Sequence, residues 1–150
     1  MDNSQLYTML EEQESLLQFS EFTNEAALKI GLLLVERARK NGKSIVIDIE
    51  RYNQKLFHYA FDGTSPNNDY WIEGKKRLVN RFYHSSLYSA LKIREGSMPS
   101  YSELGIYISG GAFPIILKNS GIIGTIAVSG LPEEDDHGYI VEALKEYLGK

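Results

Sequence analysis

Two adjacent glycines, Gly110 and Gly111, precede a short apolar run that contains Phe113 and Pro114. Glycine reaches positive φ angles at little cost, so these two amides could form a small nest that receives a carboxylate or phosphate. The pair lacks the strand, spacing and helix of a dinucleotide or phosphate-loop motif, and a simple bend at the entry to a strand is the alternative. Pro114 has no amide hydrogen for a sheet, which predicts an edge strand or a bulge there.

Ser129 and Gly130 precede an acidic segment that ends in Asp135, Asp136 and His137. A hydroxyl, a carboxylate and an imidazole so close together suggest a hydrolase. No nucleophile elbow surrounds Ser129, however, and acids in the first turn of a helix are explained by its dipole. We therefore assign no catalytic residue to this segment.

Basic residues gather in the middle of the chain, at Lys75, Lys76, Arg77, Arg81 and His84. Arg77, Arg81 and His84 share one helical face because they are spaced four and three apart. Arg81 followed by Ser85 is the part best suited to a carboxylate or phosphate, because guanidinium donates two parallel hydrogen bonds. The alternative is a solvated helix face, or ion pairing with a neighbouring subunit.

The chain has three histidines, His58, His84 and His137, and no cysteine. None of the histidines has a second ligand at a spacing typical of zinc sites, so we expect no metal site. Haem needs only one protein ligand, and a histidine or one of the ten tyrosines could supply it.

Helical periodicity predicts two N-terminal helices, over 4–19 and from the Thr23 cap to about Lys40. Further helices are expected from a cap at Asn68 or Asp69 to about 83, over 86–94, and after Pro132. Strict alternation predicts strands over 44–50 and 55–61, and a second hairpin is expected over 112–117 and 122–129. Two hairpins indicate an antiparallel sheet with packed helices, the α+β class.

Three segments carry a resemblance to the haem-degrading-domain family, which includes GlcG-like and HbpS-like proteins. They are residues 110–115, residues 121–130 and Asp135-Asp136-His137. A further segment, with Trp71, Lys75, Arg81 and Ser85-Ser86, resembles the branch of this family that consists of small stand-alone proteins. The resemblance implies a profilin-like three-layer α/β/α fold, with a five-stranded antiparallel sheet and helices on both faces. It also implies assembly as a dimer or larger ring, and haem as a possible cofactor. In this family, Ser129, Gly130 and the acidic segment with His137 would lie beside the glycine bend, which makes that place the candidate ligand cleft.

Size and charge limit the remaining possibilities. The 150 residues fit one domain, 1–150, and the net charge of −4 argues against nucleic acid as a partner. The longest apolar run is far too short to cross a membrane, and the acidic N-terminus is unlike a signal peptide, so we expect a cytoplasmic protein.

We therefore expect a homo-oligomeric domain that binds a small anionic or planar ligand. The alternatives are an oligomeric protein-interaction module without ligand chemistry and a small haem-processing enzyme. Loss of ligand affinity in a Gly111→Val variant with intact folding would indicate binding, and a changed assembly mass in a Trp71→Ala variant would indicate the interaction module. The residues expected at the ligand site are Gly110, Gly111, Phe113, Pro114, Ser129, Gly130, His137, Arg81 and Ser85.

Overall fold

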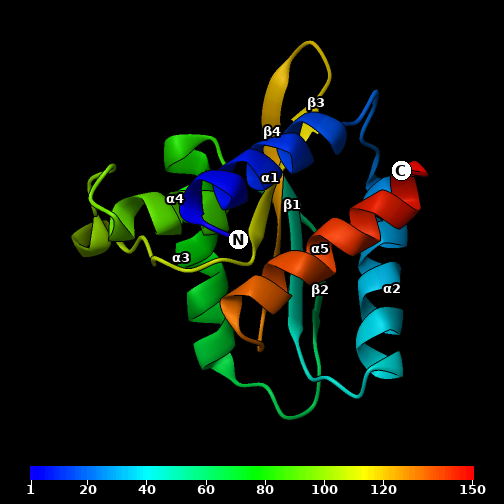
Figure 1. Ribbon diagram of the computed structural model, residues 1–150. Coiled ribbons are helices and arrows are strands. Elements are labelled where there is room, and N and C mark those ends of the chain that lie inside the picture. Colours follow the sequence, from blue (N-terminus) through cyan, green and yellow to red (C-terminus); the bar gives the residue numbers. More distant parts are fainter.

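Four strands form one antiparallel sheet in the order β2-β1-β4-β3 (Figure 1). The computed structural model describes residues 1–150. Two hairpins supply the strands, and β1 pairs with β4 to join the hairpins into one sheet. The strands are β1 (Val46–Arg51), β2 (Gln54–Ala60), β3 (Ala112–Leu117) and β4 (Gly121–Ser129). The prediction of an α+β fold with two hairpins is therefore confirmed.

The expectation of a fifth strand is wrong. β3 is the edge strand, as Pro114 predicted, and beside it the chain makes only an isolated bridge between Phe19 and Leu117. Donors for another strand are scarce along β3, because the Ala112 amide donates to the Ser86 hydroxyl at 2.9 Å and Pro114 has no amide hydrogen. A regular fifth strand therefore has too few hydrogen-bond partners at this edge.

Helices cover both faces of the sheet. α3 packs on one face, against β1, β3 and β4, whereas α2 and α5 pack on the other. α4 lies beside α3 and β3 (Figure 1), and α1 contacts α4 through the edge-on rings of Tyr7 and Tyr88. The helices are α1 (Asn3–Leu16), α2 (Asn24–Lys40), α3 (Pro66–Phe82), α4 (Ser86–Arg94) and α5 (Glu133–Leu148), with a 3-10 turn at Ser102–Leu104. No helix combines the length and apolar character needed to cross a membrane.

Local capping explains where the helices begin. Thr23 caps α2 as predicted, its hydroxyl accepting from the Ala26 amide. α3 begins earlier than the expected cap at Asn68 or Asp69. Ser65 is its N-cap and Pro66 occupies the first turn, where a missing amide hydrogen costs nothing.

The two faces of the sheet differ in polarity. The main core lies between the sheet and α2 and α5, and includes Ile47, Ile49 and Val128. The face under α3 has only a small apolar cluster, which includes Val46 and Ile72. Many of its other buried positions are polar or charged, among them Asp48, Thr125, Lys75 and Lys76. Buried charge is costly unless it is paired, so the α3 face is where a functional site is expected.

Candidate functional site

A buried ion pair joins α3 to the start of α5. The Lys75 ammonium lies 3.1 Å from Asp136 Oδ2 and donates to the Val128 carbonyl at 2.7 Å. The other Asp136 oxygen accepts from the Leu131 amide at 3.0 Å. Lys75 and Asp136 are each only 2% exposed. The pair thus holds the end of β4 and the first turn of α5 against α3.

Gly111 makes this arrangement possible. It has φ +116°, and a Cβ atom there would lie 2.7 Å from Lys75 Nζ and 2.7 Å from the Val128 oxygen. Val128 donates its amide to the Gly111 carbonyl, whereas its own carbonyl accepts from Lys75. Any side chain at Gly111 would therefore displace the Lys75 ammonium from the sheet.

Burial changes the protonation of this pair. It raises the pKa of the Asp136 carboxyl to about 6, and the nearby Lys75 ammonium opposes this rise. Burial also lowers the pKa of Lys75, which Asp136 in turn opposes. A coupled pair with shifted pKa values beside a cleft is a candidate functional site.

The pair forms the floor of a cleft of about 290 Å³. The predicted site residues Ser129 and Gly130 line this cleft, and Asn68 donates to the Ser129 hydroxyl at 3.3 Å. Trp71 forms one wall, is 40% exposed, and makes an edge contact with the Tyr107 ring. Apart from Leu131, the rest of the lining is polar and includes Asn67 and Ser109.

The amide of Gly110 already has an anionic partner. It donates to Glu133 Oε1 at 2.8 Å, and Arg94 binds the same carboxylate at 2.7 and 3.1 Å. The Gly110 amide is therefore occupied by a carboxylate of the chain itself. Of the two glycines, Gly111 lies nearer to the ion pair.

Four other residues expected at the site lie elsewhere. Phe113 is fully buried in the main core, and His137 packs against it with ring centroids 5.9 Å apart. Arg81 lies over the Tyr101 ring at 4.3 Å, whereas Ser85 is buried as the N-cap of α4. None of these four lines the cleft. Pro114 does not line it either and is buried in the edge strand.

A second cluster of charges surrounds the next residue on α3. The Lys76 ammonium lies 3.1 Å from Asp48, 3.1 Å from Glu50 and 3.0 Å from Glu73. Asp48 also accepts from Lys55, and His58 lies between Asp48 and Asp69. Burial alone would raise the pKa of Asp48, but Lys55 and Lys76 hold it below its ordinary value.

Sequence patterns did not identify either buried lysine as a paired core residue. Lys75 and Lys76 are part of the expected basic stripe, yet both are buried, whereas Arg77 and Arg81 are exposed. One sequence signal does point to pairing. Asp48 interrupts an alternating run of isoleucine and valine, and an acid at such a position needs a cationic partner.

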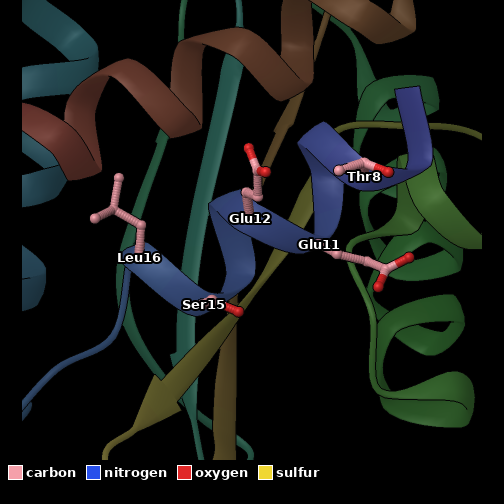
Figure 2. Close-up of a pocket in the computed structure, with 5 residues that line it drawn as sticks. All are labelled: Thr8, Glu11, Glu12, Ser15 and Leu16. Atoms are coloured by element: carbon pink, nitrogen blue, oxygen red, sulfur yellow. The ribbon is translucent and has the colours of Figure 1, made fainter. Parts of the chain in front are cut away.

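A hollow of about 570 Å³ on α1 is not a comparable site. Figure 2 shows that its lining side chains all come from this one helix. All five are exposed, and none carries a positive charge: they are Thr8, Glu11, Glu12, Ser15 and Leu16. The hollow is an open helix surface without convergent polar groups.

We expect His137 and Asp136 to affect stability in opposite directions as the solution is acidified. Burial lowers the pKa of His137 from 6.5 to about 4, so the unfolded chain takes up this proton first and stability falls as pH drops from 6.5 towards 4. Asp136 has a raised pKa, so the folded chain takes up that proton first and stability rises over a similar range.

The measurement is urea unfolding of the wild type, His137→Gln and Asp136→Asn at pH 7 and pH 5. Relative to the wild type, His137→Gln should gain about 1–2 kcal/mol on acidification and Asp136→Asn should lose about 1–2 kcal/mol. Equal pH dependence in all three proteins would contradict the prediction.

Comparison with known proteins identifies the family. A family model described as "Haem degrading protein HbpS-like" matches residues 22–145. The chain belongs to this family. A UPF0303 protein of Streptomyces coelicolor is 40% identical over 146 residues, which cover 94% of this chain and 92% of the relative.

Solved structures of other proteins share this fold. The Ybr137w protein matches with a TM-score of 0.86 and 29% identity, over 95% of this chain and 88% of that one. HbpS matches with a TM-score of 0.70 and 24% identity, over 89% of this chain and 94% of that one. The second likeness concerns the fold alone.

The family description implies haem, and the cleft does not fit it. Haem iron needs an axial ligand such as histidine, cysteine, methionine or tyrosine. None of these residues lines the cleft, whose walls are mainly polar. His137 is 3% exposed with Nε2 hydrogen-bonded to Gln13, and His58 has both ring nitrogens near carboxylates. The cleft therefore offers no side chain that could ligate haem iron.

Proposed function

We propose that the protein binds a small ligand with an acidic group in the cleft above Lys75 and Asp136. The observation that carries this proposal is the buried ion pair at the floor of the cleft. An ammonium has three N–H donors, and within the chain Lys75 uses two, on Val128 and Asp136. The third donor is available to a ligand oxygen.

The surroundings of the ion pair suit a compact, partly flat ligand. Asn67, Asn68 and Ser129 supply amide and hydroxyl groups around the floor, and Trp71 offers an aromatic wall. The lining carries one positive and one negative charge, those of Lys75 and Asp136. A bound anion adds a second negative charge beside Asp136, so it increases the proton affinity of that carboxyl. Binding is therefore expected to strengthen as the pH falls towards 6.

Thermal shift and calorimetric titration with small aliphatic and aromatic carboxylates and phosphate esters test the proposal. We expect saturable binding that weakens about tenfold in Ser129→Ala or Trp71→Ala. Tyr70→Ala is the matched control for Trp71→Ala, because Tyr70 is exposed on the same helix and does not line the cleft. Equal affinity in Trp71→Ala and Tyr70→Ala would contradict the proposal.

The same proteins test the alternative of an interaction module. Light scattering gives the mass of the assembly, and the homo-oligomer expected from the family resemblance stays a prediction until that mass is known. A changed mass in Trp71→Ala, with no ligand bound by the wild type, would indicate that Trp71 serves a subunit contact.

Haem binding at the surface is a second candidate, favoured by His84. Its Nδ1 lies 3.0 Å from Glu14, its side chain is 32% exposed, and Nε2 makes no hydrogen bond within the chain. A carboxylate on one ring nitrogen is the usual arrangement for a histidine that binds metal through the other. A saturable haemin Soret shift, lost in His84→Ala and kept in His58→Ala, would replace the cleft proposal with this one.

A further inference from the structure

A second cavity, of about 330 Å³, lies on the α3 face of the sheet, away from the cleft above Lys75 and Asp136, which we call the Lys75 cleft. It is formed by the end of β1 and the turn after it, by β4, and by the end of α3. This volume is within the range of small-molecule sites. The residues that matter here are Glu50, Tyr52, Asn53, Asn80, Tyr83 and Thr125.

Thr125 supplies an unused polar group at this cavity. It pairs with Glu50 across β1 and β4, so both side chains lie on the same face of the sheet. Thr125 is 1% exposed, and its hydroxyl has no hydrogen-bond partner within the chain. Buried hydroxyls nearly always have a partner, so a ligand group would complete this one.

Two tyrosines stand at the cavity in backbone positions that normally take glycine or asparagine. Tyr52 has φ 51° in the β1–β2 turn, and Tyr83 has φ 61° as the C-cap of α3. With Asn53, they are three of the four non-glycine residues with positive φ, and all three line this cavity. The tyrosine side chains are 71% and 69% exposed, so packing in the core does not compensate for the strain.

The charge around the cavity favours a cation. Glu50 is its only charged lining residue. The nearby Lys76 is shared among Glu50, Asp48 and Glu73, so its single charge does not neutralise them. Lys55 and Lys76 together carry two positive charges, so the three carboxylates leave one net negative charge. Tyrosine rings also attract cations through their faces.

We propose that this cavity binds a small organic cation of the ammonium or guanidinium class. Its charged head donates to Glu50 and to the Thr125 hydroxyl, and its body packs against Tyr52 and Tyr83. The site is separate from the Lys75 cleft and does not depend on an acidic ligand there.

The test is calorimetric titration of the full chain with n-butylguanidinium and n-butylammonium, with n-butanol as the neutral control. We expect saturable binding of a cation and none of butanol. Affinity should fall about tenfold or more in Tyr83→Gly and in Thr125→Val. Binding should persist in Asn119→Gly, which replaces the fourth non-glycine residue with positive φ, in the β3–β4 turn.

Thermal melting separates a ligand site from a structural role. Tyr83→Gly removes backbone strain and Thr125→Val removes an unpartnered hydroxyl, so both variants should keep or raise the melting temperature while binding weakens. Three results would overturn the proposal: no saturable heat with either cation, equal binding of butanol, or a reduced assembly mass in Tyr83→Gly that assigns the tyrosines to a contact between copies.

Discussion

Replacement of Lys75 by methionine is expected to lower the free energy of unfolding by about 3–5 kcal/mol. Methionine fills a similar volume, so the loss comes mainly from the charge of Asp136, which is 2% exposed and would keep no cation beside it. The Val128 carbonyl would also lose its hydrogen bond from Lys75. Urea unfolding at pH 8 measures this effect.

Two variants control the Lys75 experiment. Lys118→Met changes an exposed lysine in the β3–β4 turn and should alter stability by about 0.5 kcal/mol or less. The double variant Lys75→Met/Asp136→Asn removes both charges and should recover most of the stability.

Acidification should also reduce the deficit of Lys75→Met. Without the nearby ammonium the Asp136 carboxyl holds its proton more strongly, so it becomes neutral at a higher pH in the folded variant. A loss of under about 1 kcal/mol at pH 8 would show that the pair contributes little.

Replacement of Gly111 by alanine is expected to cost about 3 kcal/mol or more. The φ of +116° is unfavourable for a residue with a side chain, which accounts for about 1–2 kcal/mol. The new methyl group would also lie 2.8 Å from Asp136 Cβ and 2.7 Å from Lys75 Nζ, so the ion pair would be displaced. Thermal and urea unfolding both measure the loss.

Gly138→Ala is the matched control, because Gly138 lies inside α5 and nothing lies within 4 Å of an added Cβ. This change should stabilise the protein by about 0.5–1 kcal/mol through helix propensity. Near-equal effects at both glycines would show that Gly111 tolerates a side chain. The expectation that Gly111→Val would lose affinity with folding intact is replaced by an expected loss of folding stability.

Local sequence patterns predicted the helices and strands, whereas the start of each helix depended on which residue caps it. Alternation of Ile45, Ile47 and Ile49 predicted β1, because successive side chains of a strand point to opposite faces of the sheet. The start of α3 was misplaced because the N-cap was expected at Asn68 or Asp69, whereas Ser65 caps the helix and proline in a first helical turn is favourable.

The predicted site residues overlap only in part with the candidate cleft. Ser129 and Gly130 do line one cleft, and Gly111 lies at its ion pair. Phe113 and His137 were included because the family resemblance groups their two segments at one place. Alternation along β3 and the turn of α5 direct these two side chains into the core instead.

The sequence by itself determined the helices, the two hairpins, the α+β class and the family resemblance, because these depend on patterns within short segments. Only the tertiary structure decided that the sheet has four strands and that two adjacent lysines of α3 reach different acids, Lys75 to Asp136 and Lys76 to Asp48. The physical reason is that partners more than 25 residues apart meet only when the helix packs on the sheet. Burial then raises the cost of any charge that packing leaves unpaired.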